Sequence, residues 1–319
     1  MSISIKLPDF NHPEVCAFYE HDLSIPKEKV AQILQLPRAT LIEDMETIIM
    51  DNIQRDEYFR NYEDEDNWLS FNMHAMWVLA ELEAKEALPT LLEVLKQNDD
   101  FSEHWFSDYS TEGLWEMYYH LGKDRLDTLK EVLLKPGYWV FRIIPSHVAK
   151  EIALHHPERK QEVLDWFGSV LDAFIEMEDD DKALDGDTIS TVIVDLIGIQ
   201  AKELLPQIKI LYDKGAVFNG ITGDFQSIEQ GINHPKYKGE KGELKPSIYD
   251  RYEDAMTWYG YQMKYNPEAY KEKHTPKKTP ALPPVIQKPA VPILLKQVSK
   301  NAPCPCGSGK KYKRCCLKK

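Results

Sequence analysis

The residues of this chain best suited to chemistry are four cysteines close to its C-terminus. They lie within the last sixteen residues, at Cys304, Cys306, Cys315 and Cys316. Thiolates are soft ligands, and four of them in so short a segment favour a closed tetrahedral Zn²⁺ site over a site for a hard cation. A redox dithiol and a structural disulfide are the alternative interpretations. The pattern predicts one structural zinc ion per chain.

Proline and glycine residues around the cysteines indicate how the two pairs meet. Because Cys304 and Cys306 are two residues apart, their side chains leave the same face of an extended segment. Prolines hold φ near the extended range, and glycines permit a tight reversal. The residues concerned are Pro303, Pro305, Gly307 and Gly309. Adjacent side chains diverge in regular structure, so we expect a bend or the start of a helix at Cys315 and Cys316.

This segment resembles the SEC-C motif, named for the zinc-binding C-terminus of the SecA translocation ATPase. The motif reads Cys-x-Cys, eight residues, then Cys followed by His or Cys; here the eight are 307–314, and Cys316 stands where the translocase has His. The resemblance covers residues 301–319 and implies a small docking module. It also implies a set of zinc ligands, namely Cys304, Cys306, Cys315 and Cys316. The rest of the chain contains no phosphate-binding loop, so we predict no nucleotide cofactor.

The bulk composition is that of a folded protein outside the membrane. The chain has 319 residues, 43% of them hydrophobic, which is enough for one large domain or two ordinary ones. The N-terminal segment lacks the apolar core of a signal peptide, and no apolar run approaches the ~20 residues of a membrane span. We therefore expect a cytoplasmic protein, where thiols stay free to bind metal. The fifth cysteine, Cys16, is expected to be an ordinary semi-buried thiol.

The net charge of −13 hides two regions of opposite sign. From Lys271 onward there are 13 lysines and arginines and one acidic residue, a net charge of +12. Residues 1–270 carry 26 basic and 51 acidic side chains, a net charge of −25. An acidic region repels nucleic acid, whereas a basic tail attracts RNA, anionic lipid or an acidic protein. The alternative is that the tail folds back on the acidic region of its own chain.

The acidic region contains an internal repeat. A shift of 38 residues places the Glu-Val-Leu of 93–95 on that of 131–133. A shift of 117 residues, three times 39, places the Ala-Lys-Glu of 84–86 on that of 201–203. Repeats of ~40 to 47 residues made of helix pairs are typical of HEAT and armadillo solenoids. The clearest repeats lie in residues 72–215.

Hydrophobic periodicity predicts the helices of these repeats. Apolar residues recur at helical spacing over 73–80 and over 88–95. Pro89 and Pro206 are each expected near the start of the second helix of a pair, where a missing N–H costs little. A further unit is expected to have its two helices at Ser146–His155 and Pro157–Phe174. An earlier unit is expected within Pro26–Ile53 and a last pair near Asp224, and no alternating pattern is long enough to build a sheet.

The predicted fold class is therefore all-α. Residues 1–270 form an acidic HEAT-like helical-repeat solenoid, residues 271–300 a basic Pro-rich linker, and residues 301–319 the zinc knuckle. The linker favours polyproline II, which acts as a semi-stiff spacer. Residues 20–235 also resemble the bacterial family DUF1186, whose members often end in a SEC-C motif. This resemblance rests on helical periodicity and domain order and implies no activity.

Other side chains offer weaker candidates for a site. His155 and His156 suit a ligand pair, but the C-terminus of a helix, where a cation is favourable, is the preferred interpretation. The acidic run 176–181 lacks the spacing of a calcium loop and is interpreted as a solvated loop. An aromatic cluster forms either a peptide-binding surface or, preferably, a cover over the core. Its members are Phe101, His104, Trp105, Phe106 and Tyr109.

Two classes of function fit these observations. The first is a zinc-binding adaptor, in which the helical-repeat body binds a protein partner and the tail docks to an anionic surface. By its resemblance to SEC-C modules, the tail is expected to dock to the ribosome, with its RNA, or to the secretion machinery. The second is an enzyme of unknown reaction, with its active site in the concave, carboxylate-rich face of the solenoid. No catalytic residue is predicted, and paired carboxylates of raised pKa in a cleft would favour the enzyme.

Overall fold

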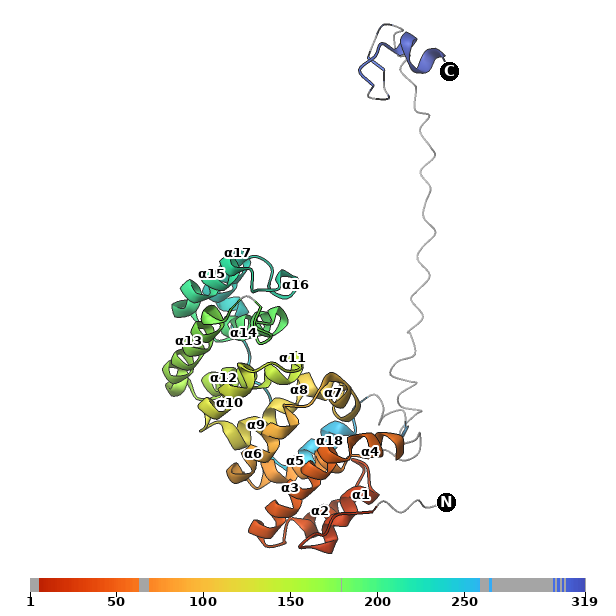
Figure 1. Ribbon diagram of the computed structural model, residues 1–319, viewed down its shortest axis with the longest axis vertical. Helices are drawn as coiled ribbons and strands as arrows, with labels where there is room; N and C mark the ends of the chain where they lie inside the picture. The colour runs from red at the N-terminus through yellow and green to blue at the C-terminus, as the bar shows by residue number, and fades with distance from the viewer. Residues whose placement is uncertain are drawn as a thin grey trace, which may run out of the picture. The chain divides into compact units, whose positions relative to one another are not determined.

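The computed structural model divides the chain into two compact units (Figure 1). The first, Met1–Tyr265, is called the body, and the second, Asn266–Lys319, is called the tail unit. The described residues are 6–62, 69–178, 180–258, 264–265, 301, 303–304, 306 and 308–318. The linker predicted at 271–300 lies outside them.

The body is helical, and its described residues contain no strand. Nine of the helices in the described residues stack in two layers. Layer A consists of α5 (Phe71–Glu81), α9 (Leu114–Gly122), α12 (Ile144–His155), α14 (Gly186–Gly198) and α17 (Phe225–Asn233). Layer B consists of α6 (Leu88–Val94), α10 (Leu126–Leu133), α13 (Lys160–Glu176) and α15 (Leu205–Lys214). The prediction of an all-α fold is confirmed, and the HEAT-like assignment stays a prediction.

The two layers pack together in chain order. In layer A, α5 contacts α9, which contacts α12, and α12 in turn contacts α14. In layer B, α13 packs against both α10 and α15, and α10 and α13 also contact α12. The helix α3 (Arg38–Gln54) packs on α5 and α6 and so covers the first helix pair. The buried apolar side chains form one core cluster that extends from Val15 to Ala255.

Shorter helices precede and connect the layers. At the N-terminal end these are α1 (Ala17–Glu20), α2 (Lys27–Ile33) and α4 (Asp56–Tyr62). Between layer helices they are α7 (Asp99–Trp105), α8 (Tyr109–Glu112), α11 (Trp139–Arg142) and α16 (Asn219–Thr222). None of the helices in the described ranges is long and apolar enough to cross a membrane.

The starts of the helices follow from the sequence. The side chains of Asn98, Asp185 and Asp224 accept hydrogen bonds from backbone N–H groups at the starts of α7, α14 and α17. Such N-caps satisfy donors that no carbonyl group within the helix reaches. Pro89 and Pro206 lie in the first turn of α6 and α15, which confirms their predicted position.

The two segments that align at a shift of 117 residues form the same turn. Glu83 and Gln200 both adopt a left-handed conformation, with φ of 45° and 56°. The next N–H, that of Ala84 or Ala201, donates to the carbonyl oxygen five residues earlier, at 2.9 and 3.0 Å. A short 3-10 helix follows, Lys85–Ala87 in one case and Lys202–Leu204 in the other. Layer A therefore passes into layer B through one repeated turn at these two places.

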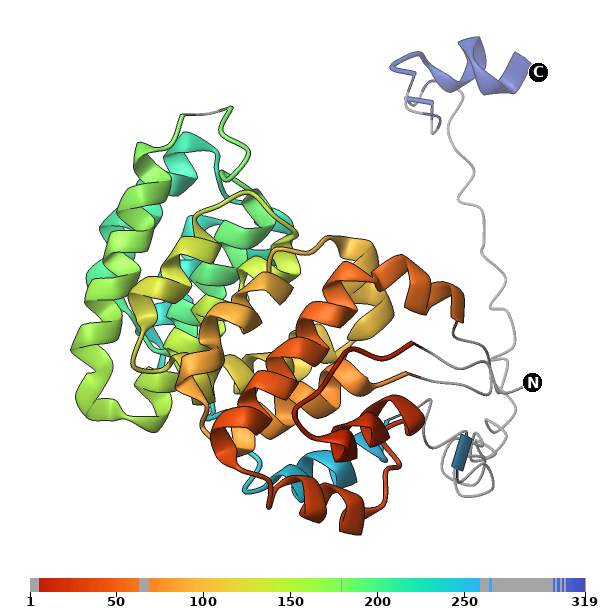
Figure 2. The ribbon, with the colours of Figure 1, turned by 60° about the horizontal axis from the view of Figure 1, so that its bottom comes forward.

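The last part of the body returns along layer A in the opposite direction. Residues 234–258, called the strap, run from α14 back to α5 and include α18 (Ile248–Ala255). Figure 2 shows α18 in light blue beside the red and orange helices of the N-terminal part. The strap is therefore a third component of the body, and the helical repeat in the sequence does not predict it.

Each layer A helix from α14 to α5 accepts a backbone hydrogen bond from the strap. The N–H of Gly239 donates to the carbonyl oxygen of Gly198 in α14, at 2.9 Å. The next three acceptors are side chains, one from each of α12, α9 and α5. They are Glu151, which accepts from Gly242 N (2.7 Å), Glu116 from Lys245 N (2.9 Å) and Glu81 from Ile248 N (2.7 Å). The strap thus ties four consecutive layer A helices together.

Candidate functional site

The structure brings the four C-terminal cysteines into one cluster. One sulfur atom from each lies within 4.8 Å of the other three, in a set of Cys304, Cys306, Cys315 and Cys316. The Sγ–Sγ distance is 3.3 Å from Cys304 to Cys306 and 3.5 Å from Cys306 to Cys315. A tetrahedral site with Zn–S bonds of about 2.3 Å has sulfurs about 3.8 Å apart. The cluster therefore fits a tetrahedral metal ion of that size.

The backbone of the tail unit accounts for this convergence. The N–H of Cys304 donates to the carbonyl oxygen of Lys310 at 2.8 Å, and Pro303 forms an isolated β-bridge with Lys311. The reversal between them contains Gly309 at a φ of +68°, a conformation that favours glycine. Two 3-10 helices follow, Tyr312–Arg314 and Cys316–Lys318. The predicted reversal and the predicted helix start at the second cysteine pair are confirmed; Pro305 and Gly307 lie outside the described residues.

The thiols of the cluster cannot all ionise by themselves. The side-chain hydrogen bonds that Cys306 shares with Ser308 and Cys304 lower its pKa to about 6. The pKa of Cys316 is raised to about 12, because it shares hydrogen bonds with the sulfurs of Cys304, Cys306 and Cys315. A negative charge on one sulfur thus holds a proton on another. A metal cation removes this conflict by replacing the protons, so binding releases protons.

All five cysteines are free thiols in the structure. Cys16 is half-buried in the body, and this burial raises the pKa of its thiol. The basic side chains of Lys310, Lys311, Lys313 and Arg314 are exposed around the cluster. A zinc ion with four thiolates carries two negative charges, so these four cations leave the surface of the knuckle positive.

The weaker candidates from the sequence have structural roles in the body. His155 is the last residue of α12 and His156 is its C-cap, as the preferred interpretation predicts. In the acidic run 176–181, Glu176 is the last residue of α13, and Glu178, Asp180 and Asp181 are exposed before α14; residue 179 lies outside the described residues. In the aromatic cluster, Phe101, Trp105 and Phe106 are 2–7% exposed and belong to the core. Three of the five aromatic residues therefore cover the core, whereas His104 is exposed and Tyr109 lines a pocket.

The carboxylate of Glu116, which accepts a hydrogen bond from the strap, is held in its ionised form. Glu116 accepts from Arg251 Nη2 at 3.0 Å, and both side chains are about as buried as core residues, at 5% and 3% exposed. Burial would raise the pKa of Glu116, but the hydrogen bond from His120 and the charge of Arg251 lower it overall. Arg251 also pairs with Glu81, at 3.2 Å.

A second buried carboxylate, in α14, has a similar environment. Asp195 accepts from Ser146 Oγ at 2.6 Å and lies 3.1 Å from His147 Nδ1 and 3.5 Å from Lys150 Nζ. Burial again raises the pKa, but the charge and hydrogen bond of His147, with the charge of Lys150, lower it overall. Asp195 and Glu116 therefore act as ionised structural groups, and a general acid would need a raised pKa.

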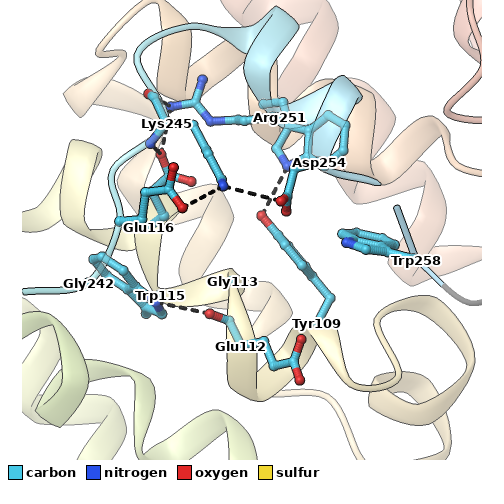
Figure 3. Close-up of a pocket in the computed structure, with 12 residues that line it drawn as sticks. Tyr109, Glu112, Gly113, Trp115, Glu116, Gly242, Lys245, Arg251, Asp254 and Trp258 are labelled. Carbon is cyan, nitrogen blue, oxygen red and sulfur yellow. Dashed lines mark hydrogen bonds and ion pairs between the residues drawn. The ribbon is translucent and has the colours of Figure 1, made fainter. Parts of the chain in front are cut away.

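A pocket of about 290 Å³ lies between the strap and the helices α5, α8 and α9 (Figure 3). Its walls carry four aromatic side chains, two cations and four carboxylates. The aromatic residues are Trp77, Tyr109, Trp115 and Trp258. The charged residues are Glu112, Glu116, Glu243, Lys245, Arg251 and Asp254. Burial raises the pKa of Tyr109, which therefore keeps its hydroxyl proton.

Sequence reasoning missed the strap and this pocket. The strap contributes Lys245, Arg251 and Trp258 to a site whose other walls lie more than a hundred residues earlier in the chain. No spacing rule connects residues so far apart. The one usable signal is the two glycines, Gly239 and Gly242, in a segment that follows the last repeat.

Two family models match the chain. The SEC-C motif matches residues 301–318. A family described as a protein of unknown function, DUF1186, matches residues 18–234. The second match covers more than half of the chain and ends where the strap begins. Both resemblances predicted from the sequence are confirmed.

Individual relatives share short stretches with the chain. The protein translocase subunit SecA of Geotalea uraniireducens (strain Rf4) is 67% identical over 27 residues, which are 8% of this chain and 3% of that protein. A UPF0225 protein of Photorhabdus laumondii subsp. laumondii is 75% identical over 20 residues, 6% of this chain and 13% of that protein. The chain thus spans a small part of the length of either relative. No solved structure matches it.

Proposed function

The chain belongs to the DUF1186 family of proteins of unknown function, and from that premise we propose that it is a zinc-binding adaptor. In this proposal the body binds a protein partner, and the tail unit docks to an anionic surface of the ribosome or of the secretion machinery. The observation that carries the proposal is the cluster of four cysteine sulfurs in a compact unit separate from the body. Such a unit can dock without disturbing the core of the body.

Zinc is the metal that the donor set favours. Four thiolates with no carboxylate or imidazole among them suit zinc or an iron–sulfur cluster, and they suit hard cations poorly. Three of the six sulfur pairs are 3.3–3.9 Å apart and all lie within 4.8 Å, which agrees with a single ion at the centre of a tetrahedron. In the proposal Cys304, Cys306, Cys315 and Cys316 hold one structural Zn²⁺. We place the protein in the cytoplasm, where thiols stay reduced.

The division of charge supports an anionic docking surface for the tail. The chain from Lys271 onward carries a net charge of +12, and residues 1–270 carry −25. A surface of RNA phosphates therefore attracts the tail and repels the body. The body stays free to engage a protein. The SecA relative is named as a translocase subunit, which supports the secretion machinery as the other candidate surface.

The enzyme hypothesis gains no specific support from the body. It called for paired carboxylates of raised pKa in a cleft, whereas the pKa values of Glu116 and Asp195 are lowered. Both carboxylates are bonded to cations of their own chain. We therefore advance the adaptor alone.

The first test measures the metal. We expect elemental analysis of the purified full chain to give close to one zinc per chain. The double variant Cys315→Ser/Cys316→Ser removes half of the ligands and should retain almost none, while Cys16→Ser should retain the full amount. Equal zinc in the double variant and the wild type would contradict the ligand assignment.

The second test measures docking by cosedimentation of the full chain with ribosomes across a salt series. A tail variant replaces Lys310, Lys311, Lys313 and Arg314 with glutamine. If each contacts one phosphate, the slope of log affinity against log salt becomes shallower by about 3. A matched control replaces four exposed lysines of the body, namely Lys96, Lys182, Lys202 and Lys238, with glutamine. Docking through the tail would be contradicted if both variants lost ribosome binding equally, or if the wild type did not pellet with ribosomes at low salt.

A further inference from the structure

The pocket under the strap has no role in the proposed adaptor. Its volume of about 290 Å³ suits the head group of a small molecule or a single residue of a peptide. The aromatic walls are fixed by their own contacts. Trp77 donates its indole N–H to the Tyr109 hydroxyl at 3.2 Å, and the rings of Tyr109 and Trp258 have centroids 5.1 Å apart. The pocket therefore presents π-faces in defined positions.

Two glycines lie where these aromatic walls approach the backbone most closely. A Cβ on Gly113 would lie 2.0 Å from the Tyr109 ring, and a Cβ on Gly242 would lie 2.6 Å from the Trp115 ring. Any other residue at either position would push a ring out of place. The sequence thus accommodates the rings from two separate segments, α8–α9 and the strap.

The charges around the pocket leave an excess of negative charge. Lys245 Nζ lies 3.0 Å from Glu243 and 3.2 Å from Asp254, so two carboxylates neutralise it. Arg251 is likewise paired with two carboxylates, one of which lines the pocket. The carboxylate of Glu112 is exposed at the pocket and has no ion-pair or hydrogen-bond partner among the described residues. Aromatic faces beside an unpaired carboxylate attract an organic cation.

A buried donor adds a second requirement. Arg251 lines the pocket and is 3% exposed, and its Nε–H has no acceptor among the described residues. A buried N–H without a partner is unfavourable, so a bound oxygen at this position is favourable. We propose that the pocket binds a small organic cation with an oxygen acceptor close to its ammonium group. Amino alcohols such as choline and the amino-terminal residue of a polypeptide share this chemistry.

Calorimetric titration of the full-length protein tests the proposal with matched probes. Choline is compared with 3,3-dimethylbutanol, which has nearly the same shape and hydroxyl but no charge. Alaninamide, which mimics the amino-terminal residue of a peptide, is compared with N-acetylalaninamide, which has lost the cation. We expect at least one charged probe to bind at least tenfold more tightly than its neutral counterpart. The tighter of the two charged probes then identifies the source of the ligand, amino alcohol or peptide.

Two substitutions connect the binding to this pocket. Glu112→Gln and Trp258→Leu are each expected to weaken the charged probe roughly three- to tenfold, the loss of one carboxylate or one cation–π contact. Glu103→Gln, an exposed glutamate outside the pocket, and Trp139→Leu, a half-buried tryptophan outside it, should leave the affinity unchanged. Equal binding of charged and neutral probes, binding unaffected by both pocket variants, or no saturable binding of either cation would overturn the proposal. The metal and the tail take no part in it, so its failure leaves the adaptor proposal standing.

Discussion

The contact between Glu116 and Arg251 joins layer A to the strap, and we predict that Glu116→Gln destabilises the body. The substitution keeps the shape of the side chain and removes its charge. In the wild type, Glu116 Oε1 accepts from both the Lys245 N–H and Arg251 Nη2, at 2.9 and 3.0 Å. Glutamine can still accept from the N–H group. The neutral amide leaves the buried guanidinium with Glu81 as its one remaining carboxylate partner.

The size of the effect follows from the burial of the pair. Removing one partner of a buried ion pair costs about 3–5 kcal/mol. Arg251 retains Glu81, whose side chain is 27% exposed and 3.2 Å away. We therefore expect the lower end of the range, about 3 kcal/mol. With an unfolding slope of about 3 kcal/mol per molar urea, the midpoint should fall by about 1 M.

Urea titration of the full-length protein, followed both by circular dichroism and by tryptophan fluorescence, measures this change. Glu112→Gln is the matched control, because the Glu112 carboxylate is exposed and lies four residues before Glu116. We expect its free energy of unfolding to change by no more than about 0.5 kcal/mol. The double variant Glu116→Gln/Arg251→Met removes both charges and should recover part of the loss. The role of the pair would be refuted if the urea midpoint of Glu116→Gln equalled that of the control. It would also be refuted if the loss of stability in the double variant equalled the sum of the losses in the two single variants.

Three further predictions concern the strap and the metal. Folding lowers the pKa of Glu116, so the contribution of its charge to stability is present above the unfolded pKa of about 4.3 and is lost as the pH falls through the folded pKa. The difference in free energy of unfolding between wild type and Glu116→Gln should therefore shrink in acid, and a difference that stays constant with pH would contradict this. Gly242→Ala places a Cβ 2.6 Å from the Trp115 ring and should cost about 1–3 kcal/mol, whereas Gly137→Ala, whose nearest neighbours lie at 3.7 Å, should cost little. Chelation of the metal should leave the helical circular dichroism and the melting temperature of the body nearly unchanged, because the cysteine cluster belongs to the other compact unit; a large loss of helix would contradict that separation.

Several helices of layers A and B were predictable because they carry their own local signals. The predicted pair Ser146–His155 and Pro157–Phe174 corresponds to α12 (Ile144–His155) and α13 (Lys160–Glu176). The start of α17 at Phe225 follows from the N-cap Asp224. The cysteine cluster was predictable for the same reason, since all four thiols and the turn that joins them lie in one short segment.

The strap and its pocket were not predictable, because their signals are spread along the chain. Glu81, Glu116 and Glu151 lie at the helix positions that accept strap N–H groups, but in the sequence they are three glutamates among 52 acidic residues. The periodicity of apolar residues identifies the buried face of each helix. It gives no sign that glutamates of successive helices accept hydrogen bonds from one segment. Arg251 is informative only once its burial is known, since an arginine in a helix as polar as α18 is ordinarily exposed.

The strap also changes where the folding unit ends. The family match stops at residue 234, so a chain cut there would keep every helix of layers A and B and lose the strap. Glu116 would lose both the Lys245 N–H and the Arg251 guanidinium, and Glu151 would lose the Gly242 N–H. The strap also covers apolar side chains of layer A, since Ile248 and Tyr252 belong to the core cluster. Uncovered apolar surface and carboxylates without their donors destabilise the same face of layer A. We therefore expect a stable body to extend to at least residue 258, beyond the part that the family match covers.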